Sequence, residues 1–191
     1  MALSIPVQKA ARILNEGGVI AYPTEGVFGL GCLPLIQDAV ERVLDIKGRD
    51  PSMGLILIAS SLSQLEPYAV LPAGERDLAG SLEHPVTWVL PAQPSAPLWL
   101  RGRHPGVAVR ISAHPVAAAL CDAAGSALVS TSANFAGQPP ARNSIVLRRC
   151  FGRLVDYVVP GDCGPARGAS EIRDHATGKV LRPAVRHRAR I

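Results

Sequence analysis

The chain has 191 residues, of which 48% are hydrophobic, and a formal net charge of +5. This length suits one domain with a sizeable core, so we expect a single domain over residues 1–191. None of the apolar runs reaches the ~18 residues that span a bilayer, which excludes a membrane helix. The basic excess is compatible with nucleotide or RNA binding, although an aromatic content of 4% argues against a stacking platform for single-stranded RNA.

The two ends of the chain and its cysteines indicate a cytoplasmic protein. The N-terminus lacks the basic and long apolar regions of a signal peptide. The four cysteines are far apart and form no CxxC pair, which favours free thiols in a reducing compartment over structural zinc. We expect an ordered core over residues 5–183 and a basic, solvated tail over residues 184–191.

The first predicted elements are a helix and a strand that runs into a glycine-rich loop. Apolar periodicity predicts a helix over Ile5–Glu16, which Ser4 is placed to cap. A buried strand is predicted over Val19–Tyr22, followed by a tight loop containing Gly26, Gly29 and Gly31. Glycines let a backbone approach a ligand closely, although an ordinary turn has the same signature.

A second helix, predicted over Gln37–Ile46, precedes two cations. We expect Lys47 and Arg49 to lie on the same side of a short extended segment, because side chains two residues apart project together there. Two such cations make a phosphate clamp, with lysine as a point charge and arginine as a bidentate fork. A solvated basic turn at the end of a helix is the alternative interpretation.

The remaining predicted elements alternate between helices and strands. In chain order they are the strand Leu55–Ala59, a short helix from Ser61 to Glu66, the helix Gly74–Leu82, the strand Val86–Leu90, a long loop over Pro91–Gly106, the strand Val107–Ile111, the helix Pro115–Ala124, the strand Ala127–Ser130, the helix Ser144–Phe151, the last long strand Val155–Val159, and two short strands at Glu171–Arg173 and Lys179–Leu181. This alternation predicts an α/β fold with a twisted, mixed sheet flanked by helices.

A polar cluster, Ser130-Thr131-Ser132-Ala133-Asn134, stands at the end of an apolar strand. Ligands of α/β sheets bind beyond the carboxyl ends of strands, so these hydroxyls and the amide are candidates for binding phosphate oxygens or Mg²⁺. A capped turn is the alternative. The sequence contains no GxxxxGK[ST] loop, no arguable Ser-His-Asp arrangement and no metal-ligand spacing among its five histidines.

Seven stretches together resemble the YrdC-like family, specifically its short members of the TsaC type. They are YPTEGVFGLG (22–31), KGR (47–49), LILIA (55–59), VAVRISAHP (107–115), LVSTSAN (128–134), SEIRD (170–174) and VLRP (180–183). The resemblance implies one YrdC-like domain with a basic concave cleft. It also implies an L-threonylcarbamoyladenylate synthase, which converts L-threonine, bicarbonate and ATP, with Mg²⁺, into threonylcarbamoyl-AMP and pyrophosphate for the t6A modification of tRNA. Proteins of the t6A transfer complex are the implied partners.

The resemblance also assigns roles to individual residues. The catalytic set that it implies is Lys47, Arg49, Ser132 and Asn134. The substrate-binding set comprises Thr24 and Ser170 for threonine, Arg110 and Arg142 for the nucleotide, and Arg182 for ATP.

The chain departs from the usual family pattern at several positions: Gly26 replaces a threonine, Phe28 a tyrosine, Asp50 stands between the KGR motif and Pro51, and Glu83-His84-Pro85 replaces a W-P-G-P stretch. A non-catalytic protein that binds double-stranded RNA or tRNA during RNA maturation is the alternative function, because of the basic balance of the chain. A carbamoyl-transfer module of a larger maturation protein is a third possibility.

Overall fold

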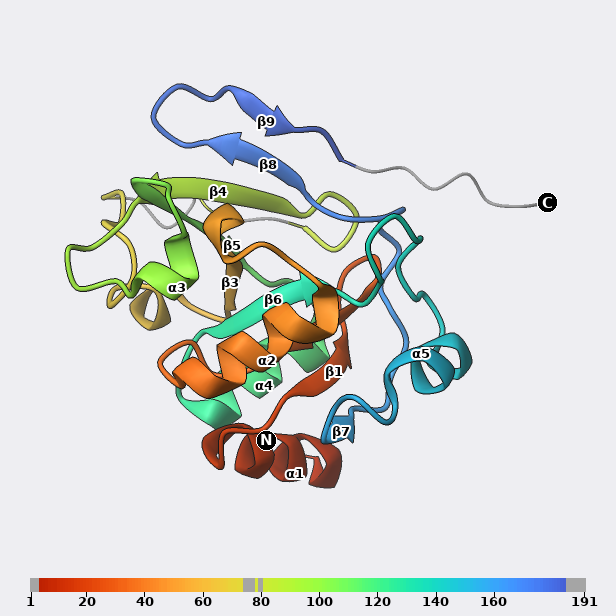
Figure 1. The fold of residues 1–191 in the computed structure, drawn as a ribbon. Helices are drawn as coiled ribbons and strands as arrows, with labels where there is room; N and C mark the ends of the chain where they lie inside the picture. The colour runs from red at the N-terminus through yellow and green to blue at the C-terminus, as the bar shows by residue number, and fades with distance from the viewer. Residues whose placement is uncertain (1–3, 74–77, 79–80, 185–191) are drawn as a thin grey trace.

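The computed structural model describes residues 4–73, 78 and 81–184, and within them the chain forms one twisted nine-stranded sheet (Figure 1). The strands are β1 (Ile20–Pro23), β2 (Phe28–Gly31), β3 (Ile56–Ala59), β4 (Val86–Pro91), β5 (Gly106–Ile111), β6 (Leu128–Ser132), β7 (Tyr157–Val158), β8 (Glu171–Asp174) and β9 (Val180–Arg182). The helices are α1 (Ile5–Asn15), α2 (Gln37–Lys47), α3 (Leu98–Arg101), α4 (Pro115–Ala124) and α5 (Ser144–Phe151), with short 3-10 turns η1 (Pro51–Met53) and η2 (Leu62–Gln64).

The sheet is mixed, and its strand order is β7-β1-β2-β6-β3-β5-β4-β8-β9. Parallel pairs join β1 to β7, β3 to β5 and β4 to β8, while the other neighbours are antiparallel. The predicted α/β class with a mixed sheet is confirmed. Because β6 lies between β2 and β3, it brings the N-terminal hairpin next to the middle of the sheet.

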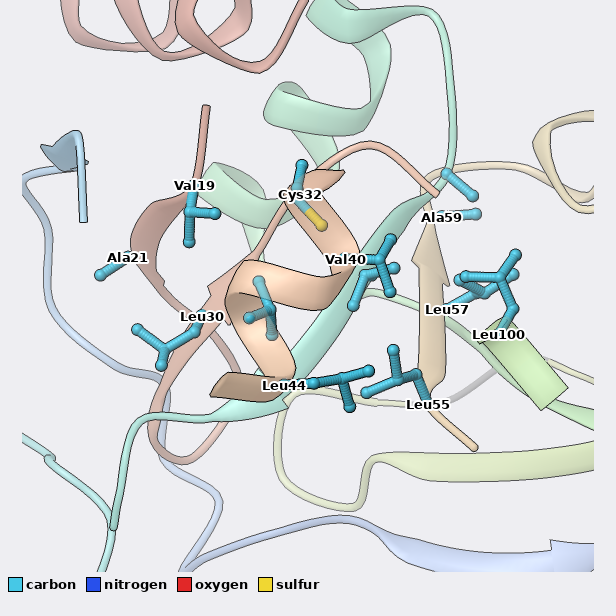
Figure 2. Close-up of a cluster of buried hydrophobic side chains, with 14 of the residues drawn as sticks. Val19, Ala21, Leu30, Cys32, Val40, Leu44, Leu55, Leu57, Ala59 and Leu100 are labelled. Carbon is cyan, nitrogen blue, oxygen red and sulfur yellow. The ribbon is translucent and has the colours of Figure 1, made fainter. Parts of the chain in front are cut away.

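Two apolar cores lie on opposite faces of the sheet, because strand residues alternate between the faces. Ile58 of β3 packs toward α1 and α4, whereas its neighbour Leu57 belongs to the core beneath α2. Figure 2 shows Val40 and Leu44 of α2 between Leu30 of β2 and Leu57 of β3 in this core. Helices therefore cover both faces, and the polar ends of the strands remain available for a site.

Two predicted helices have the bounds that the structure shows, Pro115–Ala124 and Ser144–Phe151. The prediction of a loop through Gly26–Gly31 is wrong in its second half, because Phe28–Gly31 forms β2. Antiparallel partners on both sides, β1 and β6, satisfy the backbone of β2 despite its two glycines. At Gly31 an added Cβ would lie 2.2 Å from the Val129 carbonyl oxygen, so this glycine serves close packing of strands.

Several boundaries also differ from the predictions. The predicted long strand Val155–Val159 is only Tyr157–Val158. Just before it, the Asp156 carboxylate, rather than a backbone carbonyl, accepts the hydrogen bond from the Val19 amide at 2.7 Å. The predicted loop Pro91–Gly106 contains the short helix α3. Ser4 occupies the N-cap of α1 but its side chain makes no capping hydrogen bond.

Two predictions fall partly outside the described residues. They are the helix over 74–82, of which residues 74–77 and 79–80 are not described, and the basic tail, of which residues 185–191 are not described. Among the residues that are described, no helix is both long enough and apolar enough to cross a membrane.

Candidate active site

A cavity of about 630 Å³ opens where the β1–β2 loop, the ends of β3, β5 and β6, and the β8–β9 hairpin meet. Its charged walls are more basic than acidic. They comprise Arg49, Arg101, Arg110 and Arg182 on the basic side and Glu25 and Asp174 on the acidic side, with His104 beside them. Polar side chains of Thr24, Ser130, Thr131, Ser132 and Ser170 complete the lining. The cavity therefore has the chemistry to bind an anion with several oxygen atoms.

An ion pair between two buried side chains, Glu25 and Arg110, lies in the wall of this cavity. Arg110 Nη2 lies 3.4 Å from Glu25 Oε2, and both side chains are less than a tenth exposed. Ser112 Oγ donates to Glu25 Oε1 at 2.7 Å, and the Ala113 amide donates to the same oxygen at 3.1 Å. Burial alone would raise the pKa of Glu25, but Arg110 and these donors outweigh it and leave the pKa below its usual value.

Three arginines converge on the cavity with unused hydrogen-bonding capacity. The buried Nε atoms of Arg49, Arg110 and Arg182 have no protein partner. Burial lowers the pKa of Arg182, and the nearby charges of Arg49 and Arg110 lower it further. Since only Glu25 pairs with this group in the described residues, a bound anion would satisfy both the excess positive charge and the unpaired N–H groups.

The geometry of the KGR motif differs from its prediction. Lys47 is the last residue of α2, and Gly48 ends the helix in the left-handed conformation at φ 54°. The two cations therefore do not lie side by side on an extended segment. The guanidinium of Arg49 donates to the Gly54 carbonyl at 2.8 Å and lines the cavity, whereas Lys47 turns toward β6.

Lys47 is saturated by oxygen acceptors at the end of β6. Its Nζ donates to the Ser132 carbonyl at 2.6 Å, to Asn134 Oδ1 at 2.7 Å and also to the Asn134 carbonyl. Ser132 Oγ donates to the same Asn134 Oδ1 at 2.6 Å. Lys47, Ser132 and Asn134 are thus brought together as predicted, but of these three only Ser132 lines the cavity.

On the opposite wall, Ser170 and Arg182 are also joined. Ser170 Oγ lies 2.7 Å from Thr87 Oγ1, and Arg182 Nη2 donates to the Ser170 carbonyl at 2.9 Å. The parallel pairing of β4 with β8 places Thr87 near Ser170. Sequence patterns missed Thr87 because it stands within an apolar strand and has no motif around it.

The other predicted site residues divide between the cavity and its surroundings. Thr24 lines the cavity, and its Oγ1 donates to the Val27 carbonyl at 2.7 Å, which closes the β1–β2 loop. Arg142 does not line the cavity; its Nη2 donates to the Ala166 carbonyl at 3.2 Å. Sequence patterns also missed Glu25 and Ser112. Both stand within stretches that carry the family resemblance, PTEG and RISAHP, and this position could have identified them.

The oxygen atoms of the cavity wall suit a metal ion that enters bound to a phosphate ligand. Among the described residues no three His, Cys, Asp or Glu side chains cluster closely enough to hold an ion by themselves. The hydroxyls of Ser130, Thr131 and Ser132 are oxygen donors on the cavity wall and fit Mg²⁺ that brings its phosphate ligands. Asp50 is committed elsewhere, because its carboxylate accepts from the Ser52 amide at 2.8 Å.

Comparison with known proteins identifies the family. The chain matches the Sua5/YciO/YrdC family model, described as "Telomere recombination", over residues 12–184. The chain therefore belongs to the Sua5/YciO/YrdC family, which confirms the resemblance inferred from its motifs.

Curated relatives cover almost the full length of the chain. A protein of Nitrosococcus oceani named threonylcarbamoyl-AMP synthase is 55% identical over 92% of this chain and 96% of its own length. A protein of the same name from Halorhodospira halophila is 51% identical over 92% of this chain and 93% of its own length.

Solved structures show the same fold. P. abyssi Sua5 in complex with L-threonine superposes with a TM-score of 0.80 at 31% identity, covering 93% of this chain and 54% of the longer chain. This chain therefore spans about half the length of that protein. E. coli YciO superposes with a TM-score of 0.79 at 24% identity, over 95% of this chain and 90% of its own, and supports the fold alone.

Proposed function

We propose that this chain is a threonylcarbamoyl-AMP synthase. The observation that carries the proposal is the convergence of Arg49, Arg110 and Arg182, with unpaired buried Nε atoms, on one cavity beside serine and threonine hydroxyls. The names of the full-length relatives and the threonine complex of P. abyssi Sua5 support it further.

The proposed reaction has two steps. The amine of L-threonine combines with bicarbonate to give a carbamate and water. A carbamate oxygen then attacks the α-phosphorus of ATP, the bond to the bridging oxygen breaks, and pyrophosphate leaves with its electron pair. Such chemistry depends on positioning and on neutralising charge, and it needs no protein nucleophile.

The residues divide these tasks between the two sides of the cavity. We assign Thr24 and Ser170 to L-threonine, and Arg49, Arg110 and Arg182 to the negative charges of the carbamate and of ATP. Ser132 faces the phosphates, and Lys47 with Asn134 fixes the turn that presents it. Mg²⁺, if it enters with ATP, would be held by the phosphates and by the hydroxyls of Ser130, Thr131 and Ser132 in β6, where it would neutralise phosphate charge.

Arg142 has a less direct role in this proposal. It donates to the Ala166 carbonyl and does not line the cavity, so we assign it no direct contact with the substrates. The product is expected to pass, in the cytoplasm, to the proteins that transfer the threonylcarbamoyl group to tRNA.

Pyrophosphate release from purified protein, ATP, bicarbonate, Mg²⁺ and L-threonine tests the proposal. We expect release that depends on L-threonine. The Arg49→Ala variant should lower the rate at least tenfold, or about 1.4 kcal/mol in activation free energy. Arg49→Lys should not restore it, because lysine keeps the charge but loses the planar fork.

Arg12→Ala is the matched control, since Arg12 is exposed on α1 and pairs with the solvated Glu16 at 3.9 Å. Pyrophosphate release that is independent of threonine would contradict the proposed function. A protein that binds tRNA with a steep salt dependence, and does so equally well with the cavity saturated by ATP, would favour the RNA-binding alternative.

A further inference from the structure

The connection between β7 and β8 crosses the molecule from one edge of the sheet toward the other. We call residues 161–170 of this connection the crossing segment. It lies directly against the β1–β2 loop, because the Gly164 amide donates to the Thr24 carbonyl and the Ala166 amide to the Glu25 carbonyl, both at 2.9 Å. The loop that carries Thr24 and the segment that leads into Ser170 are therefore paired through their backbones.

Glycines on both sides make this contact possible. A Cβ added at Gly26 would lie 2.3 Å from the Gly168 carbonyl oxygen and 2.9 Å from that of Ala166. A Cβ added at Gly164 would lie 2.7 Å from the Glu25 carbonyl oxygen. The nearest atoms are backbone in each case, so a side chain at either position would force the two segments apart.

The two glycines differ in their relation to the cavity. Gly26 lines it, and so do residues 168–170 of the crossing segment, whereas Gly164 does not. Residues 168–170 also line a second cavity, of about 610 Å³, so the segment is a wall between two open spaces rather than part of a packed core. The segment meets the β1–β2 loop at Gly26, and at its far end the Thr87–Ser170 hydrogen bond ties it to β4.

We propose that Gly26 is a positioning residue that sets the width of the amino-acid subsite, by letting the backbone of the crossing segment close against the β1–β2 loop. Thr24 and Ser170 then face one ligand from two walls held at a fixed separation. This inference rests on the proposed function, in which L-threonine binds between these two residues. It also gives a role to Gly26, at a position where the family resemblance predicts threonine: the missing side chain allows the close backbone contact with the crossing segment.

Binding of L-threonine alone, measured by titration calorimetry, tests the inference. We expect Gly26→Ala and Gly164→Ala each to weaken binding at least tenfold, and the double variant to bind no more weakly than the weaker single one. In steady-state assays the KM for L-threonine should rise in step, while kcat and the KM for ATP stay within twofold. Gly125→Asn is the control, since a Cβ there meets nothing within 4 Å.

The two alanine variants distinguish widening of the subsite from obstruction. Gly164 does not line the cavity, so a methyl group there cannot block L-threonine directly. If Gly164→Ala binds L-threonine normally while Gly26→Ala binds it weakly, the methyl group added at Gly26 simply obstructs the subsite. That result would overturn the inference. If neither variant folds, hydrogen exchange of the wild-type protein decides. L-threonine should slow exchange of the Gly164 and Ala166 amides at least tenfold, and unchanged exchange in the bound protein would overturn the inference.

The same experiment separates the inference from the proposed function. Wild-type protein that fails to bind L-threonine would overturn the proposed function. Wild-type protein that binds it normally, with variants that also do so, would overturn only the role of Gly26.

Discussion

Glu25 and Arg110 show how a single buried ion pair ties the site to the fold. Removing two charges from water is costly, and the cost is offset only where the remaining hydrogen bonds are made. Ser112 and Ala113 make those bonds to Glu25 Oε1, while Oε2 has the Arg110 guanidinium 3.4 Å away and no hydrogen-bond donor among the described residues. The carboxylate therefore holds one arginine of the cavity in place and leaves its Nε available to a ligand.

Replacing Glu25 with glutamine should destabilise the protein in a pH-dependent manner. At pH 7 the variant leaves Arg110 buried without a counterion, which costs about 3–5 kcal/mol in the free energy of unfolding. Because the folded-state pKa of Glu25 lies below the unfolded value, its contribution is fully present above that unfolded value and is lost as the pH falls through the folded pKa. Urea unfolding of both proteins between pH 7 and pH 3 should show the difference shrinking toward low pH.

The exposed Glu16 offers a control for this measurement. Glu16→Gln should change the free energy of unfolding by no more than about 0.5 kcal/mol, because its pair with Arg12 is solvated. If the difference in the free energy of unfolding between wild type and Glu25→Gln stays constant with pH, Glu25 is not the ionised counterion of Arg110.

Lys47 predicts a pH dependence of the same sign on the alkaline side. Burial, with a smaller contribution from Arg49, lowers the pKa of Lys47 from 10.5 to about 8. Between these values the unfolded chain binds more protons than the folded one, so the contribution of Lys47 to the free energy of unfolding rises with pH. The difference between wild type and Lys47→Met, measured by urea unfolding from pH 7.5 to 10, should therefore shift in favour of wild type. A difference that falls with pH would show that the ammonium is stabilised rather than penalised by its site.

At the scale of an element, the N-termini of α1 and α5 both follow a residue suited to capping, but only α5 is capped by a side-chain hydrogen bond. Asn143 precedes α5, and its Oδ1 accepts a hydrogen bond from the Val146 amide at 2.9 Å. Ser4 precedes α1 without such a bond. Capping therefore stabilises α5, whereas Pro6 in the first turn and the apolar face against α4 stabilise α1.

Asn143→Ala should lower the free energy of unfolding by about 0.5–2 kcal/mol, because the Val146 amide loses its acceptor. Ser4→Ala is the matched control and should cost at most a few tenths of a kcal/mol. Thermal denaturation of the two variants beside the wild type measures both. Equal losses would show that the serine caps α1 in solution.

At the scale of the molecule, the site depends on the stacking of two cores against one sheet. Leu57 of β3 is fully buried beneath α2, and β3 pairs with both β5 and β6, which carry Arg110 and Ser132. Packing in the middle of the sheet therefore sets the relative positions of two walls of the cavity.

Leu57→Ala should cost about 2–5 kcal/mol in the free energy of unfolding, the range for a large buried side chain that leaves a cavity. Ile145→Ala is the control, since Ile145 is 79% exposed and its truncation should stay within about 0.5 kcal/mol. Guanidinium denaturation measures both. A loss below 1 kcal/mol for Leu57→Ala would mean that the core collapses around the missing side chain.

Sequence patterns located most of the elements and most of the polar residues of the site. The helices Pro115–Ala124 and Ser144–Phe151 were predictable because burial of one face imposes a local period on the chain. The strand β2 was not, because its two glycines carry no strand propensity and are held by pairing with β1 and β6 on either side.

By itself the sequence determined the α/β class, the family and the stretches that would form the walls of a site. Those properties follow from local periodicity, turn chemistry and motifs. Only the tertiary structure decided which side chains meet. It directs Lys47 to the end of β6 rather than into the cavity, pairs Glu25 with Arg110, and brings the crossing segment against Gly26. These contacts join residues far apart in the chain, and they are fixed by the order of strands in the sheet, which no local pattern encodes.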